Sequence, residues 1–333
     1  MKNSLLTTQS FTKNSLQLEV NREIDRLVQF LRDSVTSKLN RRGAVVGISG
    51  GIDSSVAVAL CVKAFGANKV LGVMLPEDES SPDSERLAHD LSNQYGFSTV
   101  SENISAALAG AGCYRRRDEA IKRVIPEFGT GWRSKITLPG SLLDDETLNF
   151  FYLTAVSPEG EEVRKRLPNS EFFQIVAASN FKQRARMAML YYHAELRNYA
   201  VIGTANKNEH DLGFFVKYGD GGVDVNPIVH LFKSQIYQLA KQLGIPEEII
   251  RRTPTSDTYS AGSTQEEFFF RLPFQLLDLI WFGYEQGVKV EMIAEALELT
   301  SDQVERVIND IQRKMRTTNY LRTPAIPVKN HTD

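Results

Sequence analysis

Apolar side chains in the first hundred residues follow two spacings in turn, one typical of helices and one typical of buried strands. The elements that this pattern predicts are a helix over 18–39, strands over 44–48, 70–75 and 98–100, and helices over 54–65 and 84–95. Strands that alternate with helices in this way form a parallel sheet covered on both faces. The pattern therefore predicts an α/β fold with a doubly wound parallel sheet.

The alternation stops over residues 113–172, where proline and glycine turn signals replace it. We interpret this segment as an insertion into the α/β domain, with 151–156 and 162–167 as the arms of a hairpin around residues 158–160. The three arginines at 115–117 are interpreted as a solvated face, and a grip on an anionic ligand is the alternative.

Helices and strands alternate again after residue 172. The predicted elements are helices over 179–197 and 234–243, a strand over 199–202, an apolar stretch over 265–283, and a helical pair over 292–299 and 301–315. We expect the apolar stretch to be a buried helix or a subunit interface. Residues 1–17 are expected to form a flexible leader, and residues 18–333 a single α/β domain whose part from 265 to 316 is helical.

Composition excludes several classes of protein. The 333 residues are 42% hydrophobic and 24% charged, as in an ordinary soluble globule, and a net charge of -2 offers no attraction to nucleic acid. The helical pair near the C-terminus has no basic face that would read DNA. Cys61 and Cys113 lie far apart and form no metal or redox motif, which indicates buried, reduced thiols. No signal peptide or membrane span is present, so we expect a cytoplasmic protein.

The stretch Ile48–Ser55 joins a predicted strand to a predicted helix and reads Ile-Ser-Gly-Gly-Ile-Asp-Ser-Ser. Two adjacent glycines allow a sharp turn close to a phosphate, and free N–H groups at a helix start attract an anion. Ser54 and Ser55 are expected to cap the helix. No lysine follows the glycines, so the loop is not the usual nucleoside-triphosphatase P-loop. It resembles the pyrophosphate loop of ATP pyrophosphatases, and an ordinary glycine-rich turn is the alternative.

A second group of unusual residues follows the predicted strand 199–202. It comprises Gly203–Glu209 and Gly213–Asp224, which combine charged, aromatic and glycine residues in one block. A surface loop rarely has this composition, although a charged turn is the alternative.

Together these blocks resemble the NAD synthetase family, whose members convert nicotinic acid adenine dinucleotide to NAD. The matching blocks, in order, are the pyrophosphate loop, Asn180–Met187, Gly203–Glu209, Lys217–Asp224, Pro227, Lys233 and Pro254-Thr255. The resemblance covers about residues 20–112 and 175–316 and implies the Rossmann-like fold of ATP pyrophosphatases. It also implies amidation with ammonia through an acyl-adenylate, with release of AMP and pyrophosphate.

The resemblance implies an ATP site that includes Mg²⁺. The positions that match ATP-binding residues are Gly47, Ser49, Gly50, Gly51, Asp53, Ser54, Ser55, Thr204, Lys233 and Thr255. Asp53, Glu209 and Thr255 match metal-coordinating positions, and their oxygens suit Mg²⁺. Asp53 and Asp220 match catalytic positions, where Asp220 would orient ammonia or accept its proton.

The resemblance also implies an acceptor site and a homodimer, because the family builds the acceptor site across a two-fold interface. The matching acceptor positions are Asn180, Arg184, Lys217 and Asp224. Residues 1–43 are too few for the glutaminase module of glutamine-using members, so we expect free ammonia or a separate donor protein. The implied partners are ATP, nicotinic acid adenine dinucleotide and ammonia, without nucleic acid or membrane.

The chain departs from the family pattern at Pro254–Thr258, Glu266–Phe269 and Tyr320–Arg322, and by the insertion. Family members commonly have a His-Lys pair against the acceptor where this chain has Tyr320 and Leu321. One alternative is therefore a related amide ligase that acts on a different carboxylic acid. Another is a nucleotide-binding regulator without catalysis, which the intact Asp53, Glu209 and Lys217 disfavour.

Overall fold

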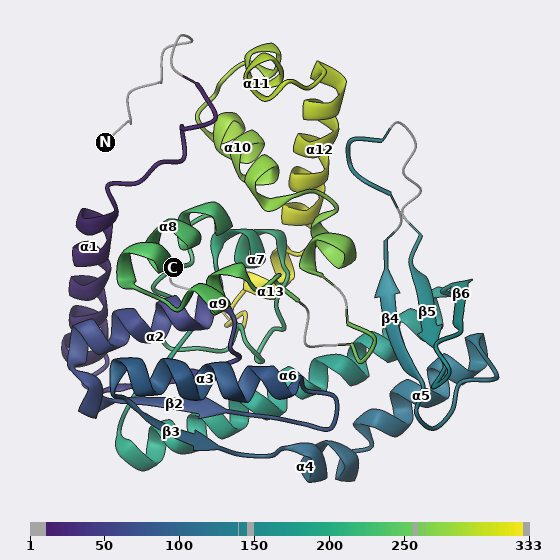
Figure 1. Cartoon of the computed structure of the whole chain (residues 1–333), viewed down its shortest axis with the longest axis horizontal. Coiled ribbons are helices and arrows are strands. Elements are labelled where there is room, and N and C mark those ends of the chain that lie inside the picture. Colours follow the sequence, from purple (N-terminus) through teal and green to yellow (C-terminus); the bar gives the residue numbers. More distant parts are fainter. Residues whose placement is uncertain (1–10, 139, 145–149, 256–258, 263, 329–333) are drawn as a thin grey trace.

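The computed structural model describes residues 11–328, apart from 139, 145–149, 256–258 and 263 (Figure 1). Its main sheet has four strands in the order β3-β2-β1-β7, all parallel. The strands are β1 (Ala44–Gly47), β2 (Val70–Met74), β3 (Ser98–Ser101) and β7 (Ala200–Ile202). The predicted α/β class and parallel sheet are therefore confirmed.

Helices cover both faces of this sheet. One face carries α1 (Val20–Arg32), α2 (Ile52–Phe65), α3 (Pro82–Tyr95), α8 (Lys233–Leu243) and α9 (Glu247–Arg251), and the other carries α4 (Ser105–Gly110) and α6 (Asn169–Arg197). Ala44 and Val46 of β1 face the first layer, whereas Val45 faces the second. Burial on both faces explains why β1 is a continuous apolar run. Within the described residues, no helix has the length and apolarity needed to cross a bilayer.

A smaller antiparallel sheet lies in the segment that was predicted to be an insertion. It has the order β4-β5-β6, formed by β4 (Arg133–Thr137), β5 (Tyr152–Val156) and β6 (Glu162–Arg166), and follows α5 (Cys113–Val124). The predicted hairpin is confirmed as β5 and β6. Strand β4 was not predicted, because only Ile136 among its residues is a large apolar side chain. Helix α6 begins at Asn169 rather than at residue 179, and Figure 1 shows it passing from this sheet to the main one.

The arginine run at 115–117 is not wholly a solvated face. Arg117 is buried and forms an ion pair with Glu79 in the loop after β2. Lys182 of α6 is also buried and pairs with the same carboxylate. The interpretation as a solvated face is wrong for Arg117, because the side of α5 that carries Arg117 packs against α6 and the loop after β2.

A second core belongs to the C-terminal helices. They are α10 (Phe274–Glu285), α11 (Val290–Leu297) and α12 (Ser301–Thr317), and the short α13 (Asn319–Arg322) follows without a buried residue. The apolar stretch at 265–283 supplies much of this core, including the fully buried Trp281. Phe11 and Leu16 of the predicted leader are buried in the same core, while its residues 1–10 lie outside the described residues.

Candidate active site

A cavity of about 560 Å³ lies beyond the C-terminal ends of β1, β2 and β7, where Gly47, Met74 and Ile202 reach its wall. Ligands of open parallel sheets bind at this edge. One face of α6, from Phe172 to Leu190, forms a long side of the cavity. Since a helix rises 1.5 Å per residue, these two positions are about 27 Å apart along the helix. The cavity is therefore elongated, with the β1 loop near the Leu190 end.

The glycine loop turns sharply and presents the start of α2 to the cavity. Gly50 has a φ of +70°, and a Cβ there would lie 2.9 Å from the carbonyl oxygen of Ser84, so only glycine fits. Helix α2 begins at Ile52 with Gly51 as its N-cap and without a side-chain cap. Its first N–H groups therefore face the site as an anion-binding end.

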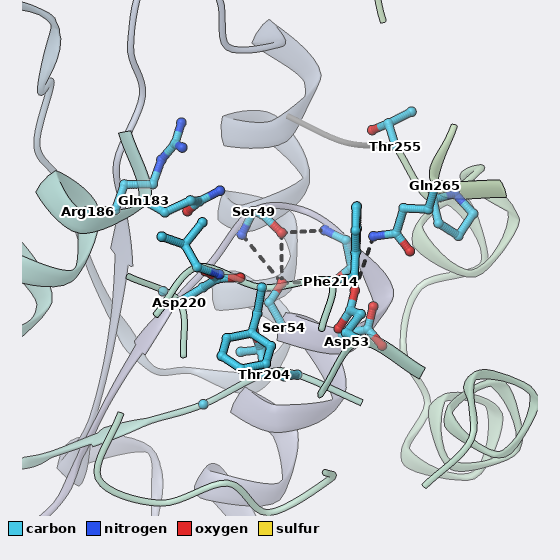
Figure 2. Close-up of a pocket in the computed structure, with 18 of the residues that line it drawn as sticks. Ser49, Asp53, Ser54, Gln183, Arg186, Thr204, Phe214, Asp220, Thr255 and Gln265 are labelled. Carbon is cyan, nitrogen blue, oxygen red and sulfur yellow. Dashed lines mark hydrogen bonds between the residues drawn. The ribbon is translucent and has the colours of Figure 1, made fainter. Parts of the chain in front are cut away.

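The expectation that Ser54 and Ser55 cap this helix is wrong. Both residues lie inside the first turn, and both hydroxyls donate hydrogen bonds back to the carbonyl oxygen of Gly51, at 3.0 and 2.9 Å. The hydroxyl oxygen of Ser54 also lies 3.3 Å from that of Ser49, and Figure 2 marks this hydrogen bond by a dashed line. The serines thus fix the shape of the loop, and Ser49 and Ser54 line the cavity.

Asp53 joins the loop to two more elements at the floor of the cavity. Its carboxylate forms an ion pair with Lys233, at the start of α8, and accepts a hydrogen bond of 3.0 Å from the side chain of Asn206. Lys233 is only 1% exposed. Burial alone would lower the pKa of Lys233, but the charges of Asp53 and Glu209 outweigh it and raise the pKa. The lysine is therefore held as a cation beside the glycine loop.

Glu209 is the second carboxylate of this group and belongs to α7 (Lys207–Leu212). It accepts hydrogen bonds from the backbone N–H of Asn206 at 3.2 Å and from the side chain of Gln265 at 3.1 Å. Burial, followed by the charge of Asp53, raises the pKa of Glu209 to about 8. At neutral pH Glu209 therefore keeps its proton and Asp53 alone neutralises Lys233, so a cation bound here would have to displace that proton to gain the second carboxylate.

Glu209 gives a test based on pH. Its pKa is raised in the folded state, so the folded chain retains a proton that the unfolded chain loses, and stability declines as the pH rises from about 4.5 to about 8. Glu209→Gln should remove this decline. Between pH 5 and pH 8, we expect the free energy of unfolding of the variant to rise by more than about 1.4 kcal/mol relative to that of the parent. Urea denaturation without divalent cations measures the difference, and Glu305→Gln, an exposed change on α12, serves as the control.

A buried network beneath the cavity fixes α7 and α8 relative to α10. Asp278 of α10 accepts hydrogen bonds from the side chain of Asn208 at 2.5 Å and from the backbone and hydroxyl of Ser234 at 2.8 and 2.5 Å. Asn208 in turn accepts a hydrogen bond of 2.9 Å from the backbone N–H of Lys233. Because Asn208 precedes Glu209 and Ser234 follows Lys233, this network sets the positions of both charged side chains.

Asp220 lies on the opposite side of the cavity from Gln265 and Thr255, beside Gln183 and Arg186 (Figure 2). Its carboxylate accepts a hydrogen bond of 2.8 Å from the backbone N–H of Val216. Burial raises the pKa of Asp220 to about 6, although hydrogen bonds and the charge of Arg186 oppose the shift. A carboxylate with this pKa is largely ionised at neutral pH and still able to take up a proton.

Comparisons with known proteins match this arrangement. The family model described as NAD synthase matches residues 23–120 and 155–323. The chain is 45% identical over 320 residues to the NH(3)-dependent NAD(+) synthetase of Rhizobium rhizogenes, with 96% of each chain covered. It is 48% identical to the protein of that name from Mesorhizobium japonicum, over 92% of this chain and 96% of the relative. The chain belongs to the NAD synthase family.

The fold agrees with solved structures of NAD synthetases. The NH3-dependent NAD synthetase of Campylobacter jejuni aligns with 94% of this chain and 100% of its own, with a TM-score of 0.59 and 21% identity. Residues 121–154 lie outside the NAD synthase family model. Because the Rhizobium relative aligns over 96% of both chains, most of that segment is shared with it.

The structure brings many of the expected NAD synthase site residues to one cavity. Those that line it are Gly47, Ser49, Gly51, Asp53, Ser54, Asn180, Thr204, Glu209, Asp220, Lys233 and Thr255. Gly50 of the glycine loop and Ser55 in the first turn of α2 are not part of the lining. Residues 256–258, where the sequence departs from the family pattern, lie outside the described residues.

Three expected acceptor-binding residues lie outside the cavity wall. Arg184 donates a hydrogen bond of 3.2 Å to the carbonyl oxygen of Lys217, whose side chain donates to the carbonyl oxygens of Tyr320 and Thr323 at 2.9 and 2.5 Å. Asp224 accepts hydrogen bonds from the hydroxyl of Tyr191 at 2.9 Å and from the backbone of Val201 at 2.8 Å. Their role in acceptor binding stays a prediction.

Some lining residues had no role in the sequence interpretation. They are Gln183 and Arg186 of α6, Phe214, Gln265, and Tyr320 with Leu321. Gln183 could have been found, because it lies three residues after Asn180 on the same helical face. Gln265 could not, since it lies at the start of the helical turn Glu266–Phe270, 56 positions from Glu209, and no pattern connects the two. Tyr320 and Leu321, a departure from the family pattern, face the same cavity as the glycine loop.

Proposed function

We propose that this chain catalyses the ATP-dependent amidation of nicotinic acid adenine dinucleotide to NAD with ammonia. The proposal depends above all on the group formed by Asp53, Lys233 and Glu209 beside the glycine loop. Family membership and the names of the relatives support the choice of acceptor and nitrogen donor. The chain is thus a ligase that forms a carbon–nitrogen bond.

In the first step, the nicotinate carboxylate of the acceptor attacks the α-phosphorus of ATP. A phosphorus–oxygen bond to the acid forms, the bond to the bridging oxygen of the β-phosphate breaks, and pyrophosphate leaves with that electron pair. We assign the binding of the departing anion to the start of α2 and the cation of Lys233. The product is an acyl-adenylate.

The residues present fit a Mg²⁺ ion bound together with ATP. Asp53 and Glu209 line one cavity, and their mutual charge contributes to the raised pKa of Glu209. Thr255 offers a hydroxyl in the same wall. The described residues contain no cluster of three or more His, Cys, Asp or Glu side chains suited to a metal, but Mg²⁺ with a nucleotide takes one or two carboxylates and completes its shell with phosphates and water. When bound, it would weaken the repulsion between phosphate and attacking carboxylate.

In the second step, ammonia attacks the acyl carbon of the adenylate. A carbon–nitrogen bond forms, the carbon–oxygen bond to the phosphate breaks, and AMP leaves. The nitrogen must also lose a proton, and we assign its acceptance to the carboxylate of Asp220. Its pKa of about 6 leaves it ionised at neutral pH, and its hydrogen bond from Val216 fixes its direction.

The test is the release of AMP and pyrophosphate from Mg-ATP. Ammonium and nicotinic acid adenine dinucleotide are each present or omitted, and glutamine replaces ammonium in a further reaction. We expect NAD and AMP in equal amounts only when ammonium and the dinucleotide are both present. AMP formation with other carboxylic acids but not with the dinucleotide would reject this acceptor and leave the ATP chemistry standing.

We also propose a homodimer that uses an exposed apolar side of α6. Phe173, Tyr192 and Leu196 are 67%, 55% and 65% exposed, and Phe181 is also exposed. At about 100° per residue, these positions lie within roughly 140° of the helix circumference, next to the side that lines the cavity. Large exposed apolar patches mark interaction surfaces. Arg184 lies within this arc of α6, about 20° from Phe173 and near the side that lines the cavity, where an acceptor held partly by a second copy would reach it.

The double change Tyr192→Glu and Leu196→Glu should convert a dimer to a monomer, because four charges at a two-fold interface repel one another. Analytical ultracentrifugation should give twice the chain mass for the parent and the single mass for the variant. Phe30→Glu, at an exposed apolar residue of α1, is the matched control and should stay dimeric. A parent that sediments as a monomer at micromolar concentration would exclude the proposal.

A further inference from the structure

The small antiparallel sheet has one face that packs on the protein and one that does not. Ile136, Leu153 and Ala155 are buried in a core shared with α5 and α6. Because side chains alternate between the two faces of a strand, their neighbours in β4, β5 and β6 belong to the opposite, outer face. Four cations lie on this outer face, namely Arg133, Lys135, Arg164 and Arg166.

The described residues provide no ion pair for any of these four cations. Arg164 and Arg166 instead lie over the rings of Tyr152 and Phe150, at 4.5 and 3.6 Å from the ring centroids. The chain as a whole has a net charge of -2, so the outer face is a local concentration of the opposite sign. A group of like charges of this kind attracts an anion.

An open hollow of about 460 Å³ lies over part of the outer face. Lys135 of β4, Thr154 of β5 and Arg164 of β6 are in register across the three strands, and all three line the hollow. Neighbouring strands are about 4.8 Å apart, so Lys135 and Arg164 flank Thr154 at about 10 Å from each other. Two long cationic side chains can therefore reach one anion above the hydroxyl of Thr154.

Arg271 contributes a third cation from the other wall of the hollow. It is 5% exposed, and its Nε donates a hydrogen bond of 3.2 Å to the carbonyl oxygen of Gly140. Burial lowers the pKa of Arg271, although the charges of Asp310 and Asp144 oppose the shift. Its φ of +60° lies in the left-handed region, and strained residues of this kind are concentrated at ligand sites. An anion in the hollow would offset part of the unfavourable burial of this charge.

We propose that this hollow binds the phosphate group of a small molecule, held between Lys135 and Arg164 above Thr154, with Arg271 on the opposite wall. The volume of the hollow is that of small-molecule sites. Guanidinium and ammonium groups form short, charge-assisted hydrogen bonds with phosphate oxygens. The ring of Tyr152 fixes the guanidinium of Arg164, which reduces the ordering that binding requires.

Two carboxylates in the same hollow restrict the ligand further. Glu162 and Glu266 line it, and Glu266 accepts a hydrogen bond of 2.9 Å from the backbone N–H of Phe274. The three cations outnumber the two carboxylates, so the hollow still favours an anion. The carboxylates suit a ligand whose remaining part carries hydroxyl groups. A nucleic acid would instead extend over the whole outer face, including Arg133 and Arg166, which do not line the hollow.

The hollow is separate from the candidate active site, and the two share no lining residue. The helical turn Glu266–Phe270 lies between them, since Glu266 lines the hollow while Gln265 and Phe269 line the active-site cavity. A ligand in the hollow therefore contacts the same turn as a substrate in the active site. The proposed phosphate site stands or falls independently of the proposed function.

The test is calorimetric titration of inorganic phosphate into the full chain. The double variant Lys135→Gln and Arg164→Gln should raise the Kd for phosphate by about tenfold or more, because two charge-assisted contacts are lost. The control is Arg133→Gln and Arg166→Gln, which removes the same charge from the same face but outside the hollow, and its Kd should stay within about twofold of the parent value. Phosphate that binds in the active site contributes equally to the parent and both variants.

Thr154→Val is a second and independent variant, because it keeps the shape of the side chain and removes only the hydroxyl. It should raise the Kd for phosphate by about threefold to tenfold. Absence of phosphate binding to the parent, or a Kd that is unchanged in the Lys135 and Arg164 double variant, would overturn the proposal. Equal weakening in the control would do so as well, since it would indicate a diffuse field over the outer face. Titration of a single-stranded oligothymidylate makes the same comparison for nucleic acid, and tight binding that both double variants weaken equally would replace the small-molecule site by an extended polyanion surface.

Discussion

Asp53→Asn should lower the rate of NAD formation by about 10³-fold or more, because a charge that acts in the transition state is removed from a preorganised site. Asn keeps the shape of the side chain, so the hydrogen bond from Asn206 has a partner oxygen. The negative charge next to Lys233 is lost, however, together with one of the two carboxylates that we propose as ligands of Mg²⁺. Both effects act on phosphate chemistry, and ATP-dependent AMP release should fall with NAD formation.

The same change should also lower the free energy of unfolding, by about 1–3 kcal/mol, because Lys233 is buried and loses its ion-pair partner. Glu209 limits the loss: without the charge of Asp53 its pKa falls, and it ionises to neutralise the lysine. Asp83→Asn is the matched control, since Asp83 is also the second residue of a helix and is exposed on α3. Urea denaturation and AMP release measure the two effects, and near-parent activity in Asp53→Asn would contradict the assignment.

The parts of the fold that the sequence predicts are those with a repeated local pattern. The run Ala44–Gly47 and the run Val70–Met74 are apolar throughout because both sheet faces are covered, and each is recognisable as a buried strand. Strand β4 has one large apolar side chain in five and is held by its pairing with β5, a long-range contact that no local pattern reveals. The start of α6 at Asn169, before the predicted start at residue 179, was missed for the same reason, because its first turns pack against the small sheet.

The candidate site likewise contains residues that a local sequence pattern identifies and residues that only tertiary contacts bring together. The glycine loop and the Gly203–Glu209 block could be interpreted from residue types, because their chemistry is local to each stretch. The ion pair of Asp53 with Lys233 spans 180 positions in the chain, and its burial is visible only in the folded structure. Gln265 reaches the cavity from the start of a helical turn and Phe151 from a loop, and neither position has a sequence signature. Residue type thus identifies the groups that are expected to bind phosphate. The positions of the residues that form the rest of the cavity wall depend on tertiary packing.

Asp278→Ala should be the most destabilising single change in the group that supports the site, with a loss of about 3–5 kcal/mol in the free energy of unfolding. The carboxylate is fully buried and accepts three hydrogen bonds, from the side chain of Asn208 and from the backbone and hydroxyl of Ser234. Alanine leaves these three donors without an acceptor in the core, and each unpaired buried donor is unfavourable by about 1–3 kcal/mol before relaxation.

The effect should reach the cavity as well, since Asn208 and Ser234 adjoin Glu209 and Lys233 in the chain. KM for ATP should rise by about tenfold in the fraction that folds, because Lys233 loses its fixed position relative to the glycine loop. Glu295→Ala, an exposed change on α11, should alter stability by less than about 0.5 kcal/mol and serves as the control. Equal unfolding free energies for the two variants would show that Asp278 does not hold α7 and α8 together. A loss of stability with an unchanged KM for ATP would show that Asp278 stabilises only the core. Asp53 alone would then fix the position of Lys233.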